Sequence, residues 1–588
     1  MARYQHLPLE TSINITRTER VDDIPLLLAQ MEKMKIAELL DKHFPMHGNW
    51  QGLSPGQIVT GWLAYILSEG DHRLNCVQGW VSSLLLTLSI CWKAPGLRAL
   101  DFSDDRLGAI LTRLGDDTHW EAYETAQAQI LLRVYDLKAV RVRIDSTTAK
   151  SYVGVSDEGL FQFGHSKEHR PDLPQLKINQ SVLDPLGMPL TTTIVSGECA
   201  DDPLYIPEIK KVQHILQQQG VLFVGDCKMA AQSTRAYLAA SHDYYLCPLS
   251  AVQMPAYTLQ DLLTSVWTGK QILTPVYRPP EVNNEQPELI AQGYIMSISL
   301  STEVDGKVIE WPEQRLIVRS LKHALAQEKA LTDRLEKAEQ AIAGLNVRGR
   351  GLKCRDEQSM SSAVNSILER YDVIGLLDIN YTLDRKIINK RAYKERAAHT
   401  LTTITSTVQT SRNVTAYEDA VRIMGWRVYV CNDLELGLTE AVLAYREQYI
   451  VERGFNRFRG KMLGLTPLYL SSTNRIKGLV RLLTIALRVL CLVEFEVRKN
   501  LLAQSEKLGG IYPGNPKRAT AKPTSEMMLR SFRGIYLTVV NFNDSDHYCM
   551  TPLTDVQIRI LALIGFSAET YLGLTPELGK LSVKMGEP

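Results

Sequence analysis

The stretch Ala139-Val-Arg-Val-Arg-Ile-Asp-Ser-Thr-Thr148 decides the fold that this sequence predicts. Its apolar residues alternate with two arginines, which is the pattern of a strand with one buried face. The strand carries the carboxylate of Asp145 to its C-terminal end. A second strand-like run, Val221-Leu-Phe-Val-Gly-Asp226, also ends in an aspartate. Because neighbouring strand ends hold side chains close together, we expect these two carboxylates ~5–7 Å apart, within reach of one bridging cation.

The amphipathic segment Tyr445–Lys461 supplies a third carboxylate. On one continuous helix, Glu452 would share a face with Tyr445 and Arg459, because their spacings are close to whole turns. Glu447 is the rival, but it points about 140° away from Glu452 on that helix. Two aspartates and one glutamate are the ligands of a two-metal phosphoryl-transfer site. The alternatives are aspartates that only cap helices and a helix that carries only solvated charges.

Composition limits the class of protein. The 588 residues predict three or four domains, and 45% apolar residues suffice for large cores. The net charge is +1, so any nucleic-acid binding needs local concentrations of charge. Nine scattered cysteines without a CxxC pair favour a reducing compartment over a zinc or disulfide framework. The N-terminus has no apolar signal region, and arginines interrupt the most apolar helix, so we expect a soluble cytoplasmic protein.

The periodicity predicts an α/β (α+β) fold in five parts. Strands are expected at 160–163, 175–183 and 188–195 around the turn Asp184–Gly187, and helices at 201–218, 229–240 and 476–498. The predicted parts are an N-terminal helical domain (1–136), the first part of the catalytic core (137–243), a β-rich insertion with a long charged helix (244–439), the second part of the core with the catalytic helix (440–505), and a basic linker with a C-terminal helical tail (506–588).

Three short stretches resemble the DDE transposases of bacterial insertion sequences. They are the ones that contain the three acids: Ile144–Thr148, Gly225-Asp226 and Tyr445–Phe455. The most similar branch has a β-rich insertion before the catalytic glutamate and a helix signature of tyrosine, arginine, glutamate and lysine. In this chain Gln448 occupies the arginine position of that signature and Arg459 the lysine position. The stretches Gly164–Leu173 and Pro523–Ile535 also resemble that branch.

The resemblance implies an RNase H-like core in which Asp145, Asp226 and Glu452 are catalytic and hold two Mg²⁺ ions, with Mn²⁺ as a substitute. It implies an enzyme that cuts and joins the ends of its own insertion sequence. Its partners would be double-stranded DNA, as terminal inverted repeats and target, and a second copy of the chain, forming a homodimer on DNA. The location would be the bacterial cytoplasm, in association with the nucleoid.

Local charge indicates where DNA would bind. Residues 453–499 hold ten Lys and Arg against two Glu, a net charge of +8, which favours phosphate contacts. The predicted DNA-binding residues are Tyr445, Arg453, Arg457, Arg459, Lys461, Lys167 and Arg170.

Other functions fit the same residues. A structure-selective nuclease of the same fold would cut DNA without joining it, and an inactive relative would only bind DNA, although all three acids are present. His165 and His169, four residues apart, would bind a metal if they shared a helical face, but no third ligand accompanies them.

Overall fold

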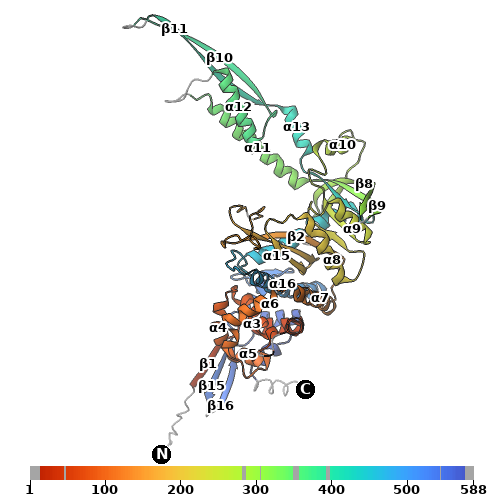
Figure 1. Cartoon of the computed structure of the whole chain (residues 1–588), viewed down its shortest axis with the longest axis vertical. Coiled ribbons are helices and arrows are strands. Elements are labelled where there is room, and N and C mark those ends of the chain that lie inside the picture. Colours follow the sequence, from red (N-terminus) through yellow and green to blue (C-terminus); the bar gives the residue numbers. More distant parts are fainter. Residues whose placement is uncertain are drawn as a thin grey trace, which may run out of the picture. The chain divides into compact units, whose positions relative to one another are not determined.

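The computed structural model describes residues 14–575 except 46, 47, 49, 168, 281–285, 305, 348–355, 393–396 and 543–544 (Figure 1). The chain forms two compact units, Met1–Tyr245 with Arg446–Pro588, and Leu246–Tyr445. Within the ranges given, no single helix has both the length and the apolar character needed to cross a membrane. Helices α4 (Leu74–Ser82) and α5 (Leu85–Trp92) meet that requirement only as a pair, which is bent by 87°.

The first unit begins with a strand, which is followed by a group of helices; the sequence predicts the helices of this region. Ser54 starts one helix with a capping box, in which its side chain and that of Gln57 each accept from the other's backbone N–H. The elements are β1 (Asn14–Arg20), α1 (Ile24–Lys33), α2 (Ile36–His43), α3 (Pro55–Glu69), α4 (Leu74–Ser82), α5 (Leu85–Trp92), a short 3-10 turn (Ala99–Phe102), α6 (Asp104–Leu114) and α7 (Asp117–Val134).

A sheet follows, with strand order β4-β3-β2-β5-β6. Strand β3 is antiparallel to β2 and β4, whereas β5 is parallel to β2. The predicted strands 175–183 and 188–195 and the turn between them are confirmed. The elements are β2 (Arg141–Lys150), β3 (Gln175–Leu183), β4 (Met188–Ser196), a 3-10 turn (Asp202–Leu204), α8 (Tyr205–Leu216), β5 (Leu222–Val224), α9 (Gln232–Ala240) and β6 (Tyr244–Pro248).

Strand β2 differs from the prediction of one buried face. It lies between β3 and β5 and is largely buried on both faces, so the alternating arginines do not mark a solvent face. The Arg143 side chain is fully buried and makes two 2.7 Å hydrogen bonds to the Asp184 carboxylate. Asp145 does not end the strand, because pairing with β3 continues to Lys150. The strand predicted at 160–163 is also wrong, since only one isolated bridge forms there.

The single helix predicted over Tyr445–Lys461 is wrong. Helix α14 (Leu438–Arg446) ends before Glu447, and α15 (Tyr449–Arg459) begins after Gln448. The break lies where these two side chains accept hydrogen bonds from Arg141 and Arg143 of β2. The next helix, α16 (Thr473–Ala503), contains the predicted helix 476–498 and is buried along most of its length.

The C-terminal region contains strands that the sequence pattern did not indicate. Strand β15 pairs with both β1 and β16, so segments from the two ends of the chain share a three-stranded sheet. Two helices, Ser525–Arg530 and Asp555–Ile564, lie in the tail that the sequence predicts to be helical. The elements are β13 (Leu508–Gly509), β14 (Ala519–Thr520), α17 (Ser525–Arg530), β15 (Tyr536–Phe542), β16 (Ser545–Met550), α18 (Asp555–Ile564) and α19 (Glu569–Leu572). Residues 576–588 of the predicted tail lie outside the described residues.

The second unit is mixed α and β, not mostly β. Its strands pair in the order β6-β12-β9-β8-β7, and β10 and β11 form a separate two-stranded ribbon. The elements are α10 (Ala256–Trp267), β7 (Thr274–Arg278), β8 (Glu288–Val304), β9 (Lys307–Ser320), α11 (Leu321–Gly344), α12 (Glu357–Tyr371), β10 (Leu377–Lys390), β11 (His399–Arg412), α13 (Val414–Ile423) and β12 (Trp426–Cys431). The predicted charged helix, α11, packs against α12 with buried Leu331, Leu335 and Ile342.

Candidate active site

The strand register brings Asp145 and Asp226 together. Strands β2 and β5 are parallel, with Arg143 level with Val224. Two residues further along each strand direction, Asp145 comes level with Asp226, which follows the end of β5. Neighbouring strands lie ~4.8 Å apart, and the Asp226 carboxylate is close enough to raise the pKa of Asp145. The two aspartates therefore form a carboxylate pair.

Asp145 is a largely buried carboxylate that holds one ammonium. Burial raises its pKa above the ordinary value, the Lys167 ammonium lowers it, and Asp226 raises it. The Lys167 Nζ lies 3.2 Å from Asp145 Oδ1 and 3.1 Å from Ser146 Oγ, and it also donates to the Ser146 carbonyl. Lys167, which the sequence predicts to bind DNA phosphate, thus forms an ion pair with Asp145 in this structure.

Asp226 is fixed by donors of its own. The Tyr205 hydroxyl donates to its Oδ1 at 2.6 Å, and the Lys228 backbone N–H donates to the same oxygen at 2.8 Å. Burial raises the pKa of Tyr205 well above its ordinary value, and Asp226 raises it further, so this phenol keeps its proton. Sequence reasoning missed Tyr205, because it starts a helix and nothing in its local pattern connects it to Asp226.

Helix α15 packs on the sheet face that carries Asp145. Val451 and Phe455 contact Val182, the cross-strand partner of Arg143, and Arg143 shares its face with Asp145 because they are two residues apart. Glu452 lies one turn after Gln448, to whose carbonyl its backbone N–H donates at 3.4 Å. Its side chain is exposed. Among the residues that the structure describes, no three of His, Cys, Asp and Glu gather closely enough to bind one metal.

The carboxylate pair supplies some, but not all, of the ligands that a divalent cation needs. Its donors are carboxylate oxygens, which Mg²⁺ prefers. Two carboxylates at this spacing repel each other unless a cation neutralises them. In this structure the Lys167 ammonium pairs with one of them, Asp145. Among the residues described, a third protein ligand is not assembled beside the pair.

Two of the predicted DNA-binding arginines form ion pairs within the protein. The Arg457 side chain is 7% exposed; its guanidinium donates to Glu494 at 2.6 Å and to Glu526 at 2.7 Å. Arg453 also pairs with Glu494. In this structure these two arginines join α15 to α16 and α17. The charge of +8 on 453–499 therefore overstates the positive surface available to DNA.

The other residues predicted to bind DNA differ in their exposure and in their partners. Arg459 is half-buried at the end of α15, and Lys461 is exposed just beyond it. Arg170 pairs with Asp172 at 2.7 Å on the surface. Tyr445 belongs to α14 in the second unit, where its ring packs against Tyr429 with centroids 4.7 Å apart. The described residues around His165 and His169 are not helical, so the shared face proposed for these histidines is absent there.

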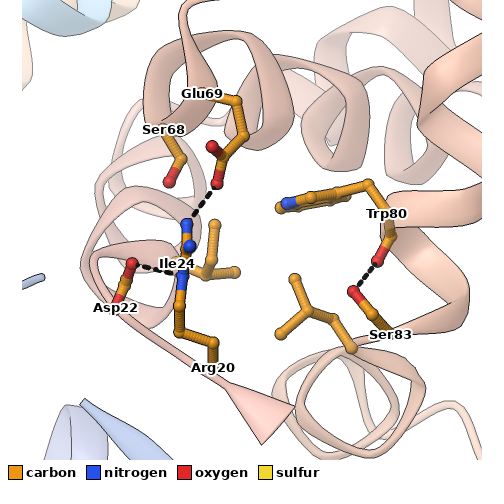
Figure 2. Close-up of a pocket in the computed structure, with 8 residues that line it drawn as sticks. Arg20, Asp22, Ile24, Ser68, Glu69, Trp80 and Ser83 are labelled. Carbon is orange, nitrogen blue, oxygen red and sulfur yellow. Dashed lines mark hydrogen bonds and ion pairs between the residues drawn. The ribbon is translucent and has the colours of Figure 1, made fainter. Parts of the chain in front are cut away.

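A cavity of about 290 Å³ lies elsewhere in the first unit, among β1, α3 and α4 (Figure 2). Its carboxylates are Asp22 and Glu69, and Arg20 binds both, at 2.8 and 2.7 Å. Arg533 also pairs with both acids. Since arginines already neutralise these acids, the cavity has no free carboxylate pair for a metal.

No protein-family model and no curated protein matches this sequence. Among solved structures, the chain is similar to the piggyBac transposase in a synaptic complex with hairpin DNA. The sequences are 8% identical, and the alignment covers 86% of this chain and 79% of that chain, with a TM-score of 0.35. A score of that size carries no conclusion about fold or function.

Proposed function

We propose that this chain is a DNA transposase of the DDE class, acting through Asp145, Asp226 and Glu452. The observation that carries the proposal is the register of Asp145 and Asp226 on two adjacent parallel strands. The strand order β4-β3-β2-β5-β6, in which antiparallel strands are followed by one parallel to the first, is that of an RNase H-like core and supports the proposal. The sequence resemblance to bacterial insertion-sequence transposases supports it independently.

In this proposal Asp145, Asp226 and Glu452 would hold two Mg²⁺ ions. When bound, such ions activate the attacking oxygen and stabilise the leaving oxygen of a phosphodiester. The residues of the chain do the rest. Tyr205 holds the Asp226 carboxylate in place, and Lys167 provides a positive charge beside Asp145, where the scissile phosphate would approach. Helix α15 carries Glu452 on the side of the sheet that holds Asp145.

Cleavage and joining of a labelled duplex test the proposal. The duplex carries the DNA that flanks the reading frame, and the protein is assayed with Mg²⁺ and a second, unlabelled target duplex. We expect cut and joined products from the wild type, none from Asp145→Asn, and both from Asp202→Asn, whose exposed carboxylate pairs with Lys228. Cutting without joining identifies a nuclease instead. If Asp145→Asn cuts and joins as well as the wild type, the active-site assignment fails.

A further inference from the structure

The ribbon of β10 and β11 is only half covered by the rest of its unit. Its base packs on α11 and α12: Leu377 and Val408 are buried in that core, and Ile379 and Tyr381 lie against it. Beyond Tyr381 the ribbon leaves the core and extends past the two helices (Figure 1). The extension of β10 from residue 383 to 390 is ~26 Å long at ~3.3 Å per residue.

The extended part of β10 has no buried face. Every side chain described from Thr382 to Lys390 is exposed. These include apolar Leu383 at 44%, Ile387 at 67% and Ile388 at 39% exposure. Because successive side chains of a strand point to opposite faces, Ile387 and Ile388 leave an apolar group on each face. A two-stranded ribbon with both faces in water is marginally stable by itself, which points to a partner.

The positive charge of the same segment indicates what kind of partner it binds. Residues 382–391 hold four Lys and Arg against one Asp, a net charge of +3, whereas the whole chain carries +1. Arg385, Lys390 and Arg391 are exposed, and none of them forms an ion pair with any other residue in the described part of the chain. A polyanion would attract these cations. A second copy of the ribbon would repel them, because it carries the same positive charge.

We propose that this ribbon enters a groove of double-stranded DNA, with Arg385, Lys390 and Arg391 on the phosphates and one of its two faces, that of Ile387 or that of Ile388, against base edges. The major groove admits a two-stranded β-ribbon, and the thymine methyl group there is an apolar contact. The inference rests on the proposed function and says where the second unit holds the duplex. It assigns DNA binding to a part of the chain far in sequence from residues 453–499.

Salt-dependent binding tests the cations. A labelled duplex of mixed sequence is titrated with full-length protein, and the binding constant is measured by fluorescence anisotropy over a range of NaCl concentrations. Each phosphate contact contributes about 0.9 to the slope of log K against log salt. The variant R385Q/K390Q/R391Q should lower that slope by about three and weaken binding about tenfold or more. The matched control, K322Q/K329Q/K337Q, removes three exposed lysines of α11 in the same unit and should change the slope much less.

The apolar pair is tested separately. I387S/I388S should weaken duplex binding and leave the salt slope unchanged, and binding equal to wild type would overturn insertion into the groove. An unchanged slope in the cation variant, or an equal loss in the α11 control, overturns the ribbon as a DNA contact. So does a change in sedimentation mass of the cation variant without DNA, because the ribbon would then pair with a second copy. A wild-type protein that binds no duplex refutes the proposed function itself, which separates the two failures.

Discussion

The ammonium of Lys167 lies 3.2 Å from Oδ1 of Asp145, so a positive charge already sits on the first carboxylate of the pair. Lys167 comes from the loop after β2 and reaches back to that strand. A divalent cation that binds the pair therefore competes with this ammonium.

Lys167→Met should strengthen Mn²⁺ binding in the absence of DNA, because the competing cation is removed. We expect a gain of roughly five- to tenfold in affinity, or ~1–1.4 kcal/mol, measured by isothermal titration calorimetry. Lys228→Met is the control, since its exposed ammonium pairs with Asp202 at 3.6 Å and not with the carboxylate pair. Weaker Mn²⁺ binding by Lys167→Met would mean that Lys167 positions Asp145 rather than competing at it.

Asp145→Asn should melt at the wild-type temperature or above it in metal-free buffer, because it removes a buried carboxylate whose pKa is raised by burial and by Asp226. DNA cleavage should be lost. The double variant with Asp226→Asn should cleave no worse than either single variant, because residues that act as one unit are not additive. Calorimetric melting and a cleavage assay check both statements. An unfolded Asp145→Asn would assign this residue a structural role.

Glu452→Gln should abolish cleavage and leave stability unchanged, because its side chain is exposed and is the proposed third ligand. Glu447→Gln should keep most activity. Its carboxylate accepts from Arg141 at 2.8 Å and from Arg143 at 3.4 Å, and its side chain is 43% exposed, so the loss of stability should be at most ~1 kcal/mol. Activity that survives in the Glu452 variant and disappears in the Glu447 variant would reverse the assignment.

Arg457→Ala should destabilise the protein by about 1.5–3 kcal/mol, because it removes hydrogen bonds to the Glu494 carboxylate, which is 4% exposed and keeps Arg453 as a partner. Lys461→Ala, on an exposed residue nearby, should change stability by less than ~0.5 kcal/mol. Urea unfolding followed by circular dichroism compares them. Equal stability of the two variants would show that Arg457 is available for DNA.

Asp23 should make stability depend on pH. Burial raises its pKa to about 6, its Oδ1 accepts from Ser68 at 2.6 Å, and its Oδ2 has no partner among the described residues. A pKa raised by folding means that the folded state binds the proton more tightly. The stabilisation is therefore full below about pH 4 and is lost as pH rises through about 6.

Asp23→Asn should remove this dependence. The stability of the variant minus that of the wild type should rise by about 3 kcal/mol from pH 4 to pH 8. This value follows from the difference of about two units between the pKa of Asp23 in the folded and in the unfolded protein. Chemical denaturation at both pH values measures it, with Asp105→Asn on the exposed face of α6 as the control. A constant difference between wild type and Asp23→Asn at the two pH values would contradict the assignment.

Local pattern determined much of this fold from the sequence alone. Strands β3 and β4 with the turn between them, and helix α16, follow from the local pattern of residues. The pairing of Asp145 with Asp226 was also predicted, because two apolar runs that each lead to an aspartate suit neighbouring strands. Such signals survive because hydrophobic periodicity and helix capping depend on neighbours only a few residues away.

Tertiary structure decided what depends on distant partners. Arg143 reads as a surface residue in its strand, yet it is buried because Asp184, 41 residues later, neutralises it. The predicted catalytic helix breaks at Glu447, whose partner Arg141 lies 306 residues earlier. Arg457 reads as a DNA contact and instead binds Glu494. A charged side chain has no fixed environment in the sequence, because its burial is settled by whichever opposite charge the fold brings to it.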